Sequence, residues 1–492
     1  MTGNTNWAMP DGIPDTLAIG GDWIAPDRDE HEESRDPATG RVIGRVALGN
    51  VNDVDRAVES SKRAFRSDWR TTTPLERSRI LTRTAALIRR DAELLARVET
   101  LDSGKPIREA RGDVETAAGY FEYYAGVADK LQGDSIPLGR DFMSFTIHEP
   151  LGVTAHIIPW NFPLVTTARG AAPALAAGNT CVIKPALITS LTALMLAPIL
   201  KEAGLPDGVY NVVTGRGSDV GDHLTSHPDV AHVTFTGSVP TGIRVMKSAA
   251  DTIASTTMEL GGKSPVVVLK DANIDAAIEG TLKAIFMNAG QVCSAGSRLV
   301  VERPVHARMI EGLVARAAAM QLGHGLDDAD IGPLVSRSQL TKVSGFVEDA
   351  RARGCSIATG GDIVKPDPAT GLNDGFFMQP TIVDDLKDED RLVQEEIFGP
   401  VLAVQIVDSP EEAISAANNT EFGLCGGIYT QDVTRALHFA RDMEAGQIFI
   451  NQYFAGGIPT PFGGVKNSGF GREKGLAALA SYYQTKCITA RI

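Results

Sequence analysis

The sequence predicts an α/β fold built from two consecutive units, and two patterns indicate it. Between about residues 153 and 269, short β-rich runs alternate with helical stretches, and a second alternation of this kind runs from 298 to 451. Such alternation is typical of a parallel sheet with helices on its faces, an architecture that binds nucleotides beyond the carboxyl ends of its strands. At 492 residues the chain is long enough for two or three domains.

The expected elements run in order as follows. Ahead of the first unit, we expect a hairpin over 17–24, a solvated charged turn over 27–36, a helix after a cap at Asn52 or Asp53, and helices near 74–101 and 107–131. The first unit has strands near 153–158, 180–183, 209–213, 232–236 and 265–269, with helices near 166–176, 189–203, 218–226 and 240–251. The second has strands near 298–302, 380–384, 400–407, 425–430 and 447–451, with helices near 305–321, 337–353, 410–419 and 432–444.

Two segments read as strands without a local partner. Residues 133–148 predict a protruding hairpin, and residues 481–492 predict an apolar strand at the chain end. Unpaired strands seek partners, so these segments are candidates for a contact between subunits. The simpler alternative is that they pair with each other.

Composition excludes several classes of function. The chain has 47 Lys+Arg against 61 Asp+Glu, a net charge of −14, and no basic cluster, which argues against nucleic acid or an anionic membrane as a partner. No apolar run is long enough to span a bilayer, and residues 1–6 show no secretory leader. The five cysteines are odd in number and include no Cys-x-x-Cys, unlike a disulfide framework or zinc site. We therefore expect a cytoplasmic protein without a bound metal.

Cys293 is the candidate nucleophile. It follows a helix-like segment, 274–286, and stands in a run of small residues that would let a substrate and backbone N–H groups approach the sulfur. For a lone cysteine, a buried and inert role is the commoner alternative.

Other candidate groups lie at strand ends and turns. Asn161, between two prolines, would offer a rigid amide donor for an oxyanion, an interaction worth ~3 kcal/mol. Glu259 precedes two glycines and could act as a general base. No Gly-x-Gly-x-x-Gly follows a strand, but Gly237 opens a strand-to-helix turn that could receive a phosphate, and Lys184 ends a strand. The alternative for Glu259 and Lys184 is an ordinary surface position.

Seven short sequence motifs are distributed over nearly the whole chain. They are Gly-Gly-Asp-Trp at 20–23, Leu-Asp-Ser-Gly-Lys-Pro at 101–106, Pro-Trp-Asn-Phe-Pro at 159–163, Met-Glu-Leu-Gly-Gly-Lys-Ser at 258–264, the cysteine stretch at 286–298, Glu-Glu-Ile-Phe-Gly-Pro-Val at 395–401, and Pro-Phe-Gly-Gly-Val-Lys-Asn-Ser-Gly-Phe-Gly-Arg-Glu at 461–473. Together they resemble the motifs of the aldehyde dehydrogenase superfamily. The resemblance implies oxidation of an aldehyde to a carboxylic acid with NAD or NADP.

The resemblance also implies roles for matching residues. Cys293 would attack the aldehyde carbonyl, Asn161 and the Cys293 backbone N–H would form the oxyanion hole, and Glu259 would activate water to hydrolyse the thioester. The residues implied at the cofactor are Lys184 and Ser238 at the adenosine ribose and pyrophosphate, Glu396 and Phe398 at the nicotinamide end, and Ile158, Pro159, Trp160, Gly217, Gly237 and Leu260 around them. Arg169, Phe162 and Phe462 would line the substrate site.

The implied architecture has a Rossmann-like cofactor domain, a catalytic domain and a small β oligomerisation arm. We predict the NAD(P)-binding domain at 1–130 and 151–260, the catalytic domain at 261–460, and the arm at 131–150 and 474–492, in a homodimer or homotetramer.

Two departures from the family pattern bear on specificity. Leu187 stands where many NAD-preferring members carry a glutamate that repels a 2′-phosphate, so we expect NADP to be tolerated, with Arg216 near enough to help. Arg169 could hold the carboxylate of a semialdehyde, but aromatic-aldehyde members also carry this arginine, and a second one is absent at Met287. A structural salt bridge is the alternative for Arg169.

Three other functions stay open. A CoA-acylating aldehyde dehydrogenase would not need the Glu259 carboxylate. A catalytically retired scaffold protein would not need Cys293, Glu259 and Asn161 together. A cofactor-free cysteine hydrolase would need a histidine partner, and none of the nine histidines lies in a motif.

Overall fold

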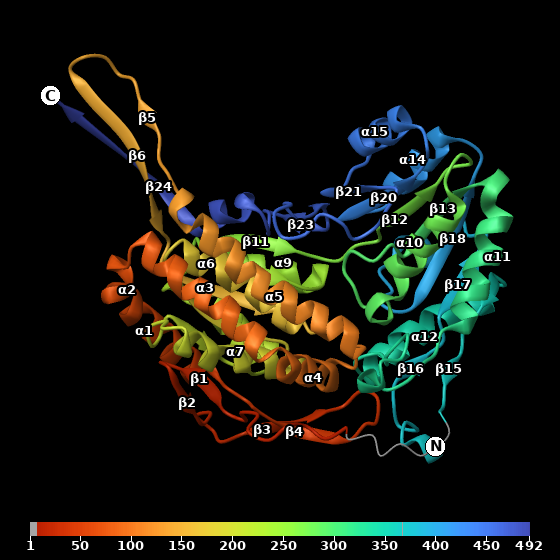
Figure 1. Cartoon of the computed structure of the whole chain (residues 1–492), viewed down its shortest axis with the longest axis horizontal. Helices are drawn as coiled ribbons and strands as arrows, with labels where there is room; N and C mark the ends of the chain where they lie inside the picture. The colour runs from red at the N-terminus through yellow and green to blue at the C-terminus, as the bar shows by residue number, and fades with distance from the viewer. Residues whose placement is uncertain (1–6, 367) are drawn as a thin grey trace.

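The computed structural model describes residues 7–366 and 368–492 and contains two α/β units and a projecting arm (Figure 1). Because residues 1–6 lie outside the described part, so does the prediction about a leader there. Within the described part, none of the helices combines the length and apolar character needed to cross a membrane.

The first unit is an eight-stranded sheet with helices on both faces. Its strand order is β2 (Asp22–Ile24), β1 (Leu17–Ile19), β9 (Tyr210–Val212), β8 (Thr180–Pro185), β7 (Val153–Ile158), β10 (Val230–Thr236), β11 (Ser255–Glu259) and β23 (Gly469–Phe470). The strands from β9 to β11 are parallel. They therefore end at a common edge, where loops can meet a ligand.

Side chains alternate between the two faces of this sheet. On one face, Cys181 and Ile183 of β8 join a core with helices α3 (Pro74–Arg90), α4 (Ala92–Ser103), α5 (Ile107–Val127), α6 (Pro163–Ala176) and α7 (Leu191–Glu202). On the other, Val182 joins a core with α1 (Val51–Arg66) and α9 (Val239–Ala250). Both faces are covered, as expected for a parallel sheet.

The second unit is a seven-stranded sheet of the same kind. Its order is β14 (Ser356–Thr359), β17 (Thr381–Asp384), β18 (Val401–Val407), β13 (Arg298–Glu302), β12 (Pro265–Val268), β20 (Cys425–Tyr429) and β21 (Gln447–Ile450). Helices α10 (Ile274–Phe286), α11 (Arg303–Ala319) and α12 (Arg337–Ala352) pack on one face, and α14 (Pro410–Asn418) and α15 (Val433–Asp442) on the other. The predicted α/β fold is confirmed in both units.

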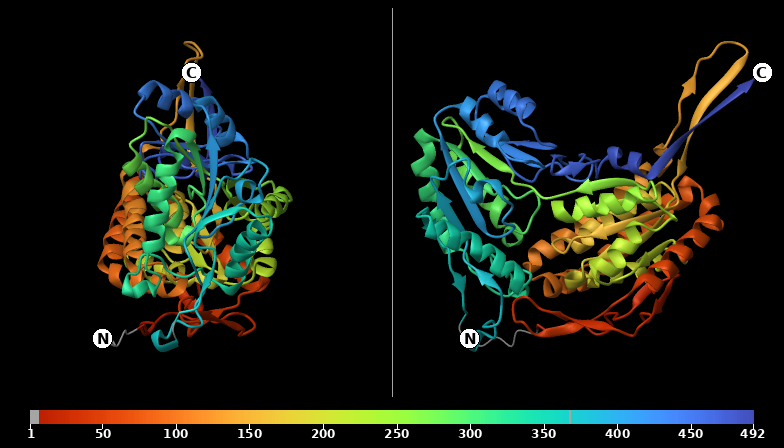
Figure 2. Two further views of the ribbon diagram at one scale, coloured as in Figure 1. Left: turned by 90° about the vertical axis from the view of Figure 1, so that its right-hand side faces the viewer. Right: turned by 180° about the vertical axis from the view of Figure 1, so that it is seen from behind.

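The arm is a three-stranded sheet that extends away from the body (Figure 2). All nine residues of β24 (Tyr483–Arg491) pair with β6 (Phe142–Pro150), and the short β5 (Ser135–Ile136) pairs with β6 on its other side. The two strands predicted to lack a local partner thus pair with each other. Among the described residues, no strand pairs with the outer edge of β24.

Four local expectations were wrong. The strand expected at 265–269 as the last of the first unit is β12, which pairs with β13 and β20 in the second sheet. Its fully buried Pro-Val-Val-Val run predicts a central strand but does not tell which sheet the strand joins. The charged run at 27–36 contains β3 (His31–Arg35), which pairs with β4 (Val42–Ala47) in an exposed two-stranded ribbon, so its charges face water from a strand instead of a turn. The helix expected over 74–101 is interrupted at Asp91, between α3 and α4. Strand β11 was missed because its polar sequence, Ser-Thr-Thr-Met-Glu, lacks apolar alternation although β10 and β23 pair with it on both sides.

Candidate active site

Two cavities meet at Cys293. One has a volume of about 390 Å³ and is lined mainly by the loops after β7, β8 and β10. The other, of about 780 Å³, is lined by α5, α6 and the segments around residues 447–474. Both are lined by Pro159, Asn161, Thr236 and Cys293. A molecule in one cavity and a molecule in the other would therefore share a boundary at this sulfur.

A sharp turn places Cys293 at this boundary. After α10 the chain passes through Asn288, Ala289 and Gly290 with φ of 48°, 53° and 74°, all in the left-handed region. A Cβ at Gly290 would lie 2.1 Å from the carbonyl oxygen of Gly399, so a glycine is required there. Left-handed non-glycine residues are sparse and cluster at functional sites.

Ionisation of the Cys293 thiol is disfavoured in the free protein. Burial raises its pKa to about 11, Arg169 opposes this rise, and the carboxylates of Glu259 and Glu396 reinforce it. The resting state is therefore the thiol, and the thiolate needed for attack is a minor species at neutral pH.

Asn161 is held from two sides in the loop between β7 and α6. Its side-chain Nδ2 donates to the carbonyl oxygen of Gln291 at 2.8 Å. An amide nitrogen carries two hydrogens, so one N–H remains for an oxyanion beside Cys293. The backbone carbonyl oxygen of Asn161 accepts hydrogen bonds from Lys105 and Asn288.

Glu259 ends β11 in a dry environment. It is 2 % exposed, and neither carboxyl oxygen has a hydrogen-bond partner among the described residues. Burial raises its pKa well above the ordinary value, the nearby Glu473 carboxylate raises it further, and Arg169 lowers it. A base with a raised pKa takes a proton from water more readily, which suits general-base catalysis near neutral pH.

The smaller cavity contains nearly all the predicted cofactor residues. Those that line it are Ile158, Pro159, Trp160, Lys184, Gly217, Gly237, Ser238, Glu396 and Phe398. Leu260 does not line it: its side chain is buried, and a Cβ at Gly242 would lie 2.5 Å from one of its methyl groups.

The start of α9 faces this cavity. Ser238 is the N-cap, it makes no side-chain capping bond, and the chain then begins a 12-residue helix. The unpaired N–H groups and dipole of such a helix end favour a phosphate. Burial lowers the pKa of the nearby Lys184 to about 8, and Glu396 accepts a hydrogen bond from the Gly262 N–H at 3.0 Å. These features fit a dinucleotide.

The sequence missed several charged residues of this cavity. Arg244 lies on α9 and pairs with Asp222 at 3.2 Å, and Lys342 reaches the same cavity from α12. None of them belongs to a recognisable motif. Arg216, predicted to help, is exposed near Glu32 and does not line the cavity.

The larger cavity is lined by Arg169, Phe162 and Phe462, as predicted. Arg169 forms an ion pair with Glu473, and its guanidinium carbon lies 5.5 Å from the centre of the Phe462 ring. The structure thus shows the salt bridge that was the alternative for Arg169. Further aromatic residues that the sequence did not single out for this cavity are Tyr120, Tyr123, Phe449 and Phe454.

Comparison with known proteins decides the family. The model of the aldehyde dehydrogenase family matches residues 23–488. The chain belongs to the aldehyde dehydrogenase family. It is 42% identical over 476 residues to 4-trimethylaminobutyraldehyde dehydrogenase A of Danio rerio, covering 96% of this chain and 93% of that one. It is 44% identical over 473 residues to betaine aldehyde dehydrogenase of Agrobacterium fabrum, with coverage of 96% and 94%.

A solved structure agrees with this assignment. Betaine aldehyde dehydrogenase from Staphylococcus aureus, determined in complex with NAD+, superposes with a TM-score of 0.95 at 36% identity, covering 97% of this chain and 95% of that one. The predicted resemblance is confirmed: this aldehyde dehydrogenase is an oxidoreductase that acts on aldehydes.

Proposed function

We propose that Cys293 is the nucleophile of this aldehyde dehydrogenase, and the observation that carries the proposal is the junction of the two cavities at its sulfur. The thiolate adds to the aldehyde carbon, and the carbonyl oxygen becomes an oxyanion that accepts hydrogen bonds from the Asn161 side chain and the Cys293 backbone N–H. A nicotinamide cofactor bound in the smaller cavity supplies the acceptor for the hydride that leaves this carbon. The product on Cys293 is a thioester.

Glu259 completes the cycle by hydrolysis. Its carboxylate takes a proton from water, the hydroxide adds to the thioester carbonyl, and the carboxylic acid leaves as Cys293 returns to the thiol form. A dry, raised-pKa carboxylate next to the junction supports this route. It also disfavours the CoA-acylating alternative, which has no use for a water-activating base.

The smaller cavity fits NAD, and we propose that NADP is accepted as well. Leu187 contributes no negative charge, and Lys184 and Arg244 line the cavity as cations. Asp222 also lines this cavity, and it is paired with Arg244. A 2′-phosphate would therefore meet no unpaired carboxylate among these residues.

The proposed substrate is an uncharged aldehyde with an apolar or aromatic body. Arg169 is already paired with Glu473, and Arg89 is paired with Glu115 and Glu122 at 2.8 and 2.7 Å. Six aromatic side chains and several aliphatic ones also line this cavity. Of the two predicted substrate classes, the aromatic aldehyde is favoured over the carboxylate-bearing semialdehyde.

Cationic aldehydes give their names to the two relatives above, and one observation weighs against that class here. The Phe462 ring already has two internal cations near it, Arg169 at 5.5 Å and Lys474 at 4.8 Å from the ring centre. A trimethylammonium group at the same ring would be repelled by both cations.

We further propose a homo-oligomer assembled through the arm, because the outer edge of β24 offers unpaired backbone groups. A cytoplasmic location also stays a prediction, supported by five unpaired cysteines.

Reduced-nicotinamide formation with a panel of aldehydes tests this function. Benzaldehyde, a medium-chain aliphatic aldehyde, succinic semialdehyde and betaine aldehyde would be assayed with NAD and NADP. We expect kcat/KM for benzaldehyde to exceed that for succinic semialdehyde by at least about tenfold, since Arg169 and Arg89 are already paired with carboxylates. Lys474, the other cation of this lining, lies over the Phe462 ring. Cys293→Ala should abolish turnover, and Cys487→Ser, at the exposed cysteine of the arm, should not.

Two results would contradict the proposal. A preference for succinic semialdehyde would mean that Arg169 exchanges Glu473 for the substrate carboxylate. If a protein that binds NAD shows no turnover, CoA would have to be the acceptor of the acyl group. If turnover is also absent with CoA, the catalytically retired scaffold would be the remaining function.

A further inference from the structure

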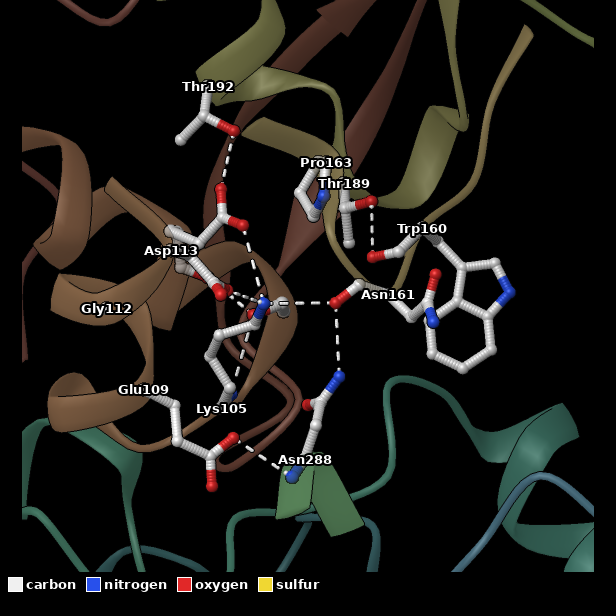
Figure 3. Close-up of polar contacts among 12 residues, drawn as sticks. Lys105, Glu109, Gly112, Asp113, Trp160, Asn161, Pro163, Thr189, Thr192 and Asn288 are labelled. Atoms are coloured by element: carbon white, nitrogen blue, oxygen red, sulfur yellow. Dashed lines mark hydrogen bonds and ion pairs between the residues drawn. The ribbon is translucent and has the colours of Figure 1, made fainter. Parts of the chain in front are cut away.

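A buried ion cluster lies directly behind the Asn161 loop (Figure 3). Its centre is Lys105, in the short link between α4 and α5, whose side chain is 0% exposed. Lys105 Nζ lies 3.0 Å from the Asn161 carbonyl oxygen and 3.5 Å from a Glu99 carboxyl oxygen, and it pairs with Asp113.

These contacts satisfy the buried ammonium. An ammonium has three N–H donors, and three acceptors surround this one. The other Glu99 oxygen accepts from the Thr192 hydroxyl at 2.6 Å. Burial by itself would lower the pKa of Lys105, but Asp113 and Glu99 outweigh it and raise the pKa, so the charge persists. The Asn161 carbonyl therefore has a charge-assisted hydrogen bond, a strong type of contact.

A second donor reaches the same carbonyl oxygen from the cysteine loop. Asn288 Nδ2 donates to it at 3.1 Å, and the Asn288 backbone N–H donates to Glu109 at 2.9 Å. The Asn161 side chain in turn donates to Gln291, two residues before Cys293. The Asn161 loop is thus joined to the cysteine loop at two points, its backbone carbonyl oxygen and its side-chain amide.

We propose that Lys105 is a positioning residue that holds the Asn161 amide in the orientation required to bind the oxyanion. The inference rests on the proposed role of Asn161. The side-chain amide can point only where the Asn161 backbone allows, and Lys105 fixes the peptide group on one side of that residue. Lys105 also lies 4.3 Å from the ring centre of Phe162, the next residue, which lines the substrate cavity.

The direct test is Lys105→Met, which keeps the side chain's length and removes its charge and donors. A 1 Å displacement of a positioned group can cost about 100-fold in rate, so we expect kcat to fall by about 10- to 100-fold. KM for the aldehyde should change little. Quenching of tryptophan fluorescence by NAD should show cofactor affinity within about threefold of the parent's, because the cofactor cavity is not lined by Lys105.

A double-variant cycle separates positioning from general stability. If Lys105 acts through Asn161, then Lys105→Met should cost less than about threefold in an Asn161→Ala background, because the group being positioned is already absent. Asn288→Ala, which removes the second donor, should show a smaller loss with the same non-additivity. Lys130→Met, at an exposed lysine just beyond α5, is the matched control and should keep parental kcat.

Each outcome has a distinct meaning. No loss in Asn161→Ala would overturn the proposed role of Asn161 itself. The positioning role alone would be overturned if Asn161→Ala lowers kcat but Lys105→Met does not. It would also be overturned if the kcat losses of the two single variants multiply in the double variant. Lys105→Met could misfold because Asp113 is left unpaired. In that case Lys105→Met/Asp113→Asn removes both charges, and Asn288→Ala leaves the ion cluster intact. Combining either variant with Asn161→Ala then tests the positioning role in the same way.

Discussion

Cys293 and Glu259, two of the proposed site residues, share one property: each is an ionisable group whose uncharged form is favoured by its surroundings. Burial raises the pKa of both Cys293 and Glu259, and Arg169 lowers both. In the free protein the thiol is therefore the resting form of Cys293, and Glu259 holds a proton more readily than an ordinary glutamate. A nucleophile in this state is protected from adventitious reaction, and it becomes reactive only when the proton is removed.

This suppression predicts the pH dependence of Cys293 alkylation in the absence of cofactor. Iodoacetamide reacts with the thiolate form of cysteine. Because the pKa of Cys293 is about 11, the thiolate fraction increases about tenfold with each pH unit between pH 6 and 9, and the alkylation rate should increase by the same factor. Peptide mass spectrometry at Cys293 would follow the rate. A plateau below pH 8 would show that the free-state thiol is already activated.

At the scale of elements, turns determine where the reactive groups lie. The left-handed turn at residues 288–290 brings Cys293 to the junction, and the open start of α9 faces the cofactor cavity. In the arm, β24 pairs along its whole length with β6, and no other strand of the described residues pairs with it.

Removal of residues 484–492 tests the role of the arm. We expect the parent protein to be a dimer or tetramer and the truncated protein to be smaller, because the strand edge proposed for subunit contact is gone. Light scattering after size-exclusion chromatography would measure the mass. NAD binding by the truncated protein is the control for folding, and an unchanged mass in a folded protein would exclude the arm as the main contact.

The sequence predicted strands and helices best where apolar periodicity was strong. β13 was placed at its observed bounds, whereas β11, with its polar residues paired on both sides, was missed. Cys293, Asn161 and Glu259 were predicted as site residues because they lie in motifs, and all three line the smaller cavity. Lys105 lies in a motif too, but its role depends on Glu99, Asp113 and Asn161, which only the fold brings together.

For the whole molecule, chemistry depends on both units. β7 and β11 of the first sheet carry Asn161 and Glu259 at their ends, whereas Cys293 precedes β13 of the second. Figure 1 shows the two units packed together, and residues of both units line each cavity. In the covalent cycle that we propose, the second unit therefore supplies the nucleophile, and the first supplies the oxyanion donor and the base.

The most direct test is a rapid-mixing experiment with Glu259→Gln, saturating NAD and benzaldehyde. We predict a burst of one reduced nicotinamide per active site, then turnover about 10²- to 10⁴-fold slower than in the parent, with an acyl adduct on Cys293 in the intact mass. Turnover at the parental rate, or the absence of both burst and adduct in a protein that binds NAD, would contradict the account.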